Sequence, residues 1–205
     1  MTRLFLVRHG KIEGESDRYY GHTAIGLSQE GVRQAEMLRD HLASRNLGMI
    51  YSSDLKRAFD TAGIIATTHK LKVIPCSDLR EFDIGRLVGM TFEEMKERYQ
   101  GAVRLLSGQE PDISAPGGES LRQMSTRIQR FVAEVQKQPP EQMLIVAHGG
   151  SLKVLLCLLL GISLEHWWQF RLAHASLTVV ETYPEGAVLC LLNDTSHLER
   201  SQEIS

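Results

Sequence analysis

The sequence predicts an α/β fold: a three-layer α/β/α sandwich whose sheet is mostly parallel, with one antiparallel edge strand. Short apolar segments alternate with amphipathic helical patterns, which is typical of a sheet covered by helices on both faces. The early apolar segments are continuous rather than alternating, as expected for parallel strands buried on both sides. The length of 205 residues suits a single domain, residues 1–205.

Six segments are predicted as strands because they are short and rich in aliphatic residues. In chain order they are RLFLVRH (3–9), GMIYSS (48–53), LKVIPC (71–76), QMLIVAHG (142–149), SLTVVETY (176–183) and AVLCLLN (187–193). The last two are joined around Pro184, Glu185 and Gly186, a pattern typical of a hairpin. This hairpin supplies the antiparallel member of the sheet.

Amphipathic patterns predict helices between these strands. A helix beginning at Ser28 carries apolar residues at helical spacing, namely Val32, Ala35, Leu38 and Leu42. Thr91 with Glu94, and Ser120 with Gln123, match the capping box that opens a helix. The longest amphipathic pattern follows the second of these boxes, with Leu121, Met124, Ile128, Phe131, Val132 and Val135 on its apolar face.

Composition excludes several classes of protein. The net charge of −2 provides no basic surface, so no nucleic-acid partner is expected. The longest apolar run, VLLCLLLGI (154–162), is shorter than the roughly 20 residues that a membrane span needs, so it predicts a buried helix and no membrane partner. The three cysteines, Cys76, Cys157 and Cys190, are widely separated, which argues against a disulfide framework. Because no signal-peptide pattern is present either, we expect a cytoplasmic location.

Two histidines are predicted at the same edge of the sheet. His9 follows the first predicted strand, next to Arg8, and His148 follows the fourth in a similar arrangement of apolar run, histidine and glycine. Doubly wound sheets bind ligands beyond the carboxyl ends of their strands. Glu81 lies in the turn after the third strand and is expected at the same edge.

Arg57 is predicted in the first turn of a helix that Ser53 or Asp54 would cap. A cation is unfavourable there, because the amino end of a helix is already positive. A bound anion would reverse this effect, since the backbone amides and the guanidinium would all face one oxyanion.

Each of these residues also has a purely structural interpretation. An arginine or a glutamate can be a solvated surface charge, and a strand-end histidine can be a hydrogen-bonded core residue. Two histidines could also begin a zinc site, but the chain has no HxH or HxxxH spacing and the neighbouring arginines repel metal ions. We therefore expect no metal and no cofactor. The joint placement at one sheet edge favours an anion-binding site.

Four segments in this order, LVRHG, SSDLKRAFDTA, LREFDIG and VAHGGSLK, resemble the histidine phosphatase superfamily, with its phosphoglycerate mutase-like fold. GLSQEGVRQAE, PGGES and NDTSHL are similar to further stretches of its small phosphatase branch, which includes alpha-ribazole phosphatase and broad-specificity phosphatases. The resemblance covers nearly the whole chain.

The resemblance implies a role for each site residue. His9 would accept the phosphoryl group as nucleophile, and Glu81 would protonate the leaving oxygen and then activate water. Arg8, Arg57 and His148 would surround the phosphoryl oxygens without a metal.

Further residues are expected to form the outer part of the pocket, where the rest of the substrate would bind. We expect Tyr20, Gly21 and Gly149 to contact the substrate, together with Tyr19, His22 and the loop before Gly118 in the outer wall.

The chain departs from the family at two places. Lys11, Ile12 and Glu15 stand where glutamate, threonine and asparagine are often found. Either Glu15 or Ser16 would have to replace the contact of that asparagine with the phosphoryl group. GRLVG replaces the common GxWEG pattern after the catalytic glutamate.

These observations favour a phosphomonoesterase that acts on a small phosphorylated metabolite, such as alpha-ribazole 5'-phosphate or a broader set of esters. The alternatives are a phosphoglycerate mutase, a fructose-2,6-bisphosphatase-type activity and a phosphate-binding module without turnover. The mutase is disfavoured because Phe82, Asp83 and Ile84 follow the glutamate, where mutases have arginine and tyrosine. The oligomeric state is left open, with a homodimer as one alternative.

Overall fold

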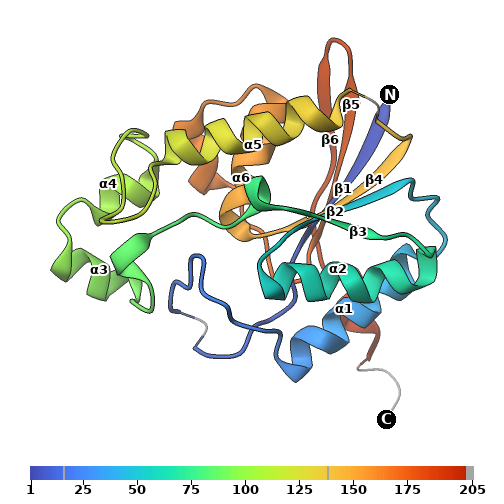
Figure 1. Ribbon diagram of the computed structural model, residues 1–205, viewed down its shortest axis with the longest axis horizontal. Helices are drawn as coiled ribbons and strands as arrows, with labels where there is room; N and C mark the ends of the chain where they lie inside the picture. The colour runs from blue at the N-terminus through green and yellow to red at the C-terminus, as the bar shows by residue number, and fades with distance from the viewer. Residues whose placement is uncertain (16, 138, 202–205) are drawn as a thin grey trace.

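The centre of the protein is one six-stranded sheet (Figure 1). The structure, a computed structural model, describes residues 1–15, 17–137 and 139–201. Its strands follow the predicted segments: β1 Thr2–Arg8, β2 Met49–Ser53, β3 Val73–Cys76, β4 Gln142–Ala147, β5 Leu177–Tyr183 and β6 Gly186–Asp194. The strand order is β3-β2-β4-β1-β5-β6. Strands β1 to β4 are parallel, whereas β5 is antiparallel to both β1 and β6. The predicted sheet, mostly parallel with an antiparallel edge, is therefore confirmed.

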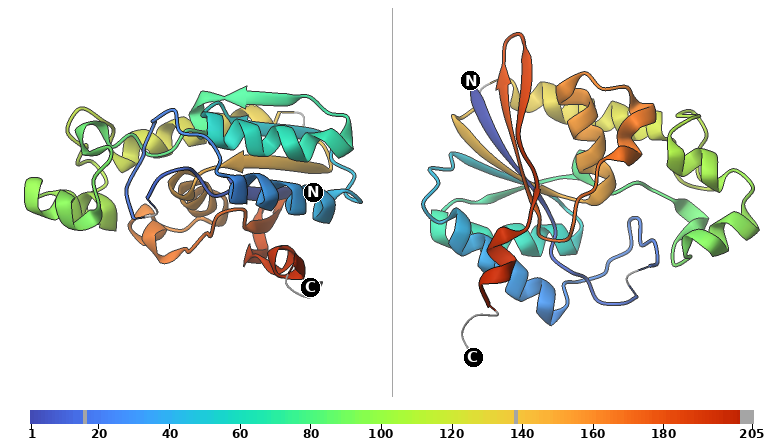
Figure 2. Two further views of the ribbon diagram at one scale, coloured as in Figure 1. Left: turned by 90° about the horizontal axis from the view of Figure 1, so that it is seen from below. Right: turned by 180° about the vertical axis from the view of Figure 1, so that it is seen from behind.

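Helices cover both faces of this sheet. The α-helices are α1 Gln29–Leu42, α2 Lys56–His69, α3 Phe92–Arg98, α4 Ala102–Ser107, α5 Leu121–Val135 and α6 Gly149–Leu160. The 3₁₀ helices are η1 Ser77–Leu79, η2 Gly85–Leu87, η3 Leu164–Gln169 and η4 Ser196–Ser201. Helices α1 and α2 lie on one side of the sheet and α5 and α6 on the other, while α3 and α4 extend beyond it (Figure 1 and Figure 2). Among the helices that the structure describes, none is both long and apolar enough to cross a membrane.

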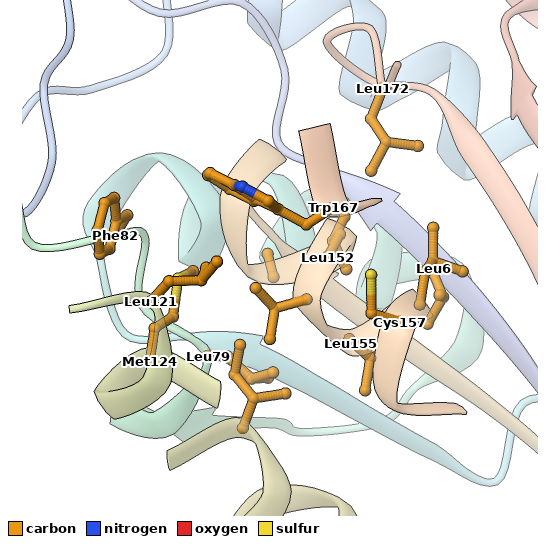
Figure 3. Close-up of a cluster of buried hydrophobic side chains, with 14 of the residues drawn as sticks. Leu6, Leu79, Phe82, Leu121, Met124, Leu152, Leu155, Cys157, Trp167 and Leu172 are labelled. Carbon is orange, nitrogen blue, oxygen red and sulfur yellow. The ribbon is translucent and has the colours of Figure 1, made fainter. Parts of the chain in front are cut away.

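An apolar core lies on each face of the sheet. On the α1–α2 side, Leu38 and Ala62 pack in one cluster with Val146 of β4. The larger cluster, on the other side, joins α5, α6, the segment after Glu81 and η3 (Figure 3). There the rings of Phe82 and Trp167 meet edge to face, with centroids 6.2 Å apart. This contact anchors the chain next to Glu81 against η3.

The predicted helix starts are largely correct. The Ser28 side chain caps α1, and the capping boxes expected at α3 and α5 are both present. Val32, part of the apolar pattern predicted for this helix, is 37% exposed and lies beside the buried stripe of α1 rather than in it. The predicted cap of α2 was wrong: the capping residue is Leu55, and no side chain caps this helix. Asp54 cannot serve because Arg80 holds its carboxylate through two hydrogen bonds of 2.8 and 2.6 Å.

Candidate active site

The carboxyl ends of β1 and β4 bring the two strand-end histidines together. In the parallel register Arg8 lies beside Ala147, so His9 and His148, each one residue further along, are neighbours. Their ring centroids are 5.1 Å apart, with the rings inclined by 61°. Both side chains are buried, which separates them from ordinary surface histidines.

The imidazole of His9 presents one defined nitrogen for chemistry. Its Nδ1 lies 2.8 Å from the carbonyl oxygen of Gly10. A carbonyl only accepts hydrogen bonds, so Nδ1 carries the proton and Nε2 holds the lone pair. Burial, with Arg8 and Arg57 nearby, holds the pKa of His9 well below its usual range. The ring is therefore neutral near pH 7, and Nε2 is a competent nucleophile.

His148 is fixed from the neighbouring strand β2. Its Nε2 lies 2.8 Å from the hydroxyl oxygen of Ser53, and its backbone N–H donates to the hydroxyl of Ser151 at 3.1 Å. Burial lowers the pKa of His148 well below its ordinary value, and His9 adds to this effect. His148 is thus a neutral, immobilised ring packed against the nucleophile.

Arg8 is held by the segment that precedes β5. Its Nη1 donates to the carbonyl of Leu172 at 2.6 Å, and its Nη2 lies 3.0 Å from Nε2 of His174. A guanidinium only donates, so Nε2 of His174 accepts and the ring proton lies on Nδ1. Burial, together with Arg8 and then Lys11, lowers the pKa of His174 to about 4. Within the described residues, the buried Nε of Arg8 has no hydrogen-bond partner, so this N–H is an unsatisfied donor beside the histidine.

Arg57 lies in the first turn of α2, as predicted, and is only 2% exposed. Its Nη2 donates to the carbonyl of Gly21 at 2.7 Å and its Nη1 to that of Thr23 at 3.1 Å. These bonds tie the loop after β1 to α2. The low exposure excludes the interpretation of Arg57 as a solvated surface charge.

The carboxylate of Glu81 bridges its own loop and the start of α6. Its Oε1 accepts from the N–H of Phe82 at 2.8 Å, and its Oε2 accepts from the N–H of Gly150 at 3.1 Å. A Cβ atom on residue 150 would lie 2.2 Å from Glu81 Oε1, so a larger residue there would displace the carboxylate. Gly150 therefore determines where the carboxylate lies.

A cavity of about 880 Å³ lies at this edge of the sheet. Seven of the predicted site residues line it: Arg8, His9, Tyr20, Gly21, Arg57, Glu81 and Gly149. The eighth, His148, is wholly buried and is not in the lining, so its contact with a phosphoryl group stays a prediction.

The outer wall differs from the sequence-based expectation. Tyr19 lines the cavity as expected, but His22 and the loop before Gly118 do not. His22 instead donates to the backbone carbonyl of Glu81 at 2.7 Å. The loop packs instead on the segment after Glu81, where the N–H of Arg86 donates to the carbonyl of Pro116 at 2.9 Å. Residues 167, 168 and 170–174 form this wall in its place.

Glu15 and Ser16 were the two residues expected to replace the asparagine that often contacts the phosphoryl group in this family. The carboxylate of Glu15 forms an ion pair with Arg18, although Glu15 also lines the cavity. Ser16 lies outside the described residues. Within the part of the chain that the structure describes, no group of three or more histidine, cysteine, aspartate or glutamate side chains could hold a metal ion.

Sequence reasoning missed three residues of the site: His174, Gly150 and Lys153. His174 precedes β5, which is antiparallel and therefore begins at the sheet edge where β1 ends. Gly150 and Lys153 follow His148 on α6, and both line the cavity. The predicted antiparallel strand and the helix after His148 were the signals that could have identified them.

The geometry suits the binding and transfer of a tetrahedral oxyanion. Arg8 and Arg57 supply positive charge, His9 a lone pair on Nε2, and Glu81 a carboxyl group on the wall of the same cavity. Two buried guanidinium groups can stabilise charge that develops on a transferring group.

Comparisons with known proteins agree with this chemistry. Residues 4–195 match the family model of the histidine phosphatase superfamily, branch 1. The chain is 36% identical over 200 residues to phosphoserine phosphatase 1 of Hydrogenobacter thermophilus, covering 97% of this chain and 95% of that one. Two solved structures are similar. A mycobacterial glucosyl-3-phosphoglycerate phosphatase with bound VO3 has a TM-score of 0.86 and 29% identity, covering 95% of this chain and 100% of that one. The alpha-ribazole phosphatase of Shigella flexneri has a TM-score of 0.83 and 27% identity, covering 94% and 96%.

Proposed function

The chain belongs to branch 1 of the histidine phosphatase superfamily and is a small-molecule phosphatase, and we propose that it hydrolyses O-phosphoserine through a phosphohistidine at His9. The observation that carries the mechanism is the lone pair on His9 Nε2, which belongs to a neutral ring in a cavity that Arg8 and Arg57 also line.

In the first step, His9 Nε2 attacks phosphorus and the bond between phosphorus and the ester oxygen breaks. The leaving alkoxide takes a proton from the carboxyl group of Glu81. Arg8 and Arg57 offset the charge on the three phosphoryl oxygens during this transfer. The products are an alcohol and a phosphorylated imidazole, with Glu81 left as a carboxylate.

In the second step, water attacks the phosphohistidine. Glu81 removes a proton from the water as the new P–O bond forms, and the bond between phosphorus and Nε2 breaks. Inorganic phosphate leaves, His9 regains its lone pair and Glu81 is again protonated. The same carboxyl group thus acts as acid and then as base, which its anchorage to the N–H of Gly150 supports.

Phosphoserine is the favoured substrate because the phosphoserine phosphatase of Hydrogenobacter thermophilus is 36% identical over nearly the full length of both chains. Alpha-ribazole 5'-phosphate, favoured by sequence motifs, is the second candidate, since an alpha-ribazole phosphatase has the same fold at 27% identity.

The proposal is tested by phosphate release in the presence of a chelator. We expect the highest kcat/KM with O-phosphoserine, compared with alpha-ribazole 5'-phosphate and 3-phosphoglycerate, and an acid-labile phosphoryl label on wild type that His9→Ala lacks. Conversion of 3-phosphoglycerate to an isomer without phosphate release would support the mutase instead. Binding of these esters without turnover would support the binding module.

A further inference from the structure

Five cationic side chains line the cavity, and they differ in how they are paired. Arg8 and Arg57 face the phosphoryl position, and Arg171 is exposed to solvent. Arg18 donates to the carbonyl of Gly89 and pairs with two glutamates. Lys153 is partly buried, yet within the described residues its ammonium group has no hydrogen bond and no ion pair. Lys153 is therefore a partly buried cavity cation that the described part of the protein leaves without a hydrogen bond or an ion pair.

The place of Lys153 on α6 relates it to the phosphoryl position. It lies four residues after Gly149, so both residues project from the same face of the helix. Gly149 borders Arg8, because a Cβ atom there would lie 3.5 Å from Arg8 Nε. One helical turn, about 5.4 Å along the axis, therefore separates the part of α6 next to Arg8 from the lysine. Lys153 therefore lines the same cavity as Arg8, about one helical turn further along α6.

The surroundings of the ammonium group favour an anionic ligand. Nζ of Lys153 lies 5.6 Å from the centroid of the Trp167 ring, a cation–π contact that holds the side chain against the cavity wall. Burial lowers the pKa of Lys153, and the carboxylate of Glu81 partly opposes this shift. Removing a cation from part of its water is costly when no protein acceptor replaces that water, and a carboxylate from a ligand would supply both an acceptor and the opposite charge.

We infer that Lys153 binds a carboxylate of the substrate, so that this phosphatase selects phosphate esters of hydroxycarboxylic acids, serine among them. The inference rests on the proposed function only for the phosphoryl end of the ligand. It names the residue and the functional group by which esters with a carboxylate are preferred over esters without one.

The test compares pairs of esters that differ in the carboxylate alone. O-phosphoserine is paired with O-phosphoethanolamine, and 3-phosphoglycerate with glycerol 3-phosphate. Wild type should prefer the carboxylate member of at least one pair. In Lys153→Met, which keeps the stem over Trp167, the ratio of kcat/KM within the pair should fall about tenfold or more, mainly through KM, because a charge-assisted contact is lost. Lys153→Arg should restore most of the ratio.

The control is Lys96→Met, which removes a lysine that is ion-paired on α3 and lies outside the cavity lining. This variant should leave the ratio as in wild type. An equal loss for both members of a pair in Lys153→Met would overturn the inference, because Lys153 would then act on the phosphoryl group. An unchanged ratio would overturn it as well.

The failure of the proposed substrate is distinguishable from these outcomes. If wild type releases no phosphate from O-phosphoserine, that substrate is wrong, and the glycerate pair decides the role of Lys153. If wild type prefers the carboxylate member in neither pair, the inference itself is wrong, whichever ester the enzyme hydrolyses best.

Discussion

Replacing His174 with glutamine should make the protein less sensitive to acid. Its pKa lies at about 4 in the folded protein, compared with 6.5 ordinarily, so the unfolded chain binds a proton there that the folded protein excludes. Stability from this group is present above pH 6.5 and is lost as the pH falls towards 4. Between about pH 8 and pH 5 the two pKa values allow a loss of about 2 kcal/mol in unfolding free energy. Because the ring is partly exposed, solvent screens part of the effect, so this value is an upper limit.

Denaturant unfolding at these two pH values measures the effect. From pH 8 to pH 5, the unfolding free energy of wild type should fall by about 1–2 kcal/mol more than that of His174→Gln. His174→Leu also lacks the titration and should match His174→Gln in this respect. If both variants lose as much as wild type, His174 is not neutral in the folded protein and the assignment of its tautomer fails.

The same pair of variants tests the contact with Arg8. Glutamine offers an oxygen that can accept from Nη2, whereas leucine offers none, so His174→Leu should raise KM and weaken inhibition by inorganic phosphate by about tenfold relative to His174→Gln. Equal kinetics for the two variants would show that the bond of 3.0 Å to Nη2 does not position Arg8.

Three further predictions concern the chemistry. In Glu81→Gln, the first step should slow by about 10²–10⁴-fold with alkyl phosphates and far less with p-nitrophenyl phosphate, which should show a burst of nitrophenolate. Equal losses for both esters without a burst would remove Glu81 as general acid. Gly150→Ala should lower kcat with little change in melting temperature, because a Cβ atom would lie 2.2 Å from Oε1 of Glu81; wild-type kcat would show that the carboxylate can move without cost. Dialysis against EDTA should leave turnover intact, and a loss that zinc or magnesium reverses would contradict the arginine-based mechanism.

The strands could be predicted because each is a short apolar run. Burial does not follow from composition alone, because β3 and β6, at the two edges of the sheet, contain no buried residue, whereas β1 and β4 in its interior are mostly buried. The helix starts at Ser28, Thr91 and Ser120 could be predicted because a cap is a local interaction between residues three positions apart. The cap of α2 could not, because Asp54 is occupied by Arg80, which is 26 residues distant. Local patterns cannot reveal such competition between two possible partners.

The residues nearest to His9 could be predicted from the topology of the sheet. Arg8, His9 and His148 stand at strand ends, and parallel strands end at one edge, so the topology alone brings them together. Arg57 is also reached this way, since α2 begins near the end of β2. The loop before Gly118 was misplaced because its length and polarity indicate an exposed segment but not the direction in which it packs.

The outer wall of the cavity shows that an antiparallel strand also brings residues to the active site. An antiparallel strand begins where its parallel neighbour ends, and in the register Leu177 of β5 lies beside Val7 of β1. The residues just before β5 must therefore arrive at the active-site edge, which explains why Leu172 and His174 reach Arg8. By the same reasoning α6, which starts at the end of β4, must direct its first turns, and with them Lys153, along the cavity. The sequence predicts the antiparallel strand but not its neighbour, so the residues before β5 could be assigned to the site only once the structure placed β5 beside β1.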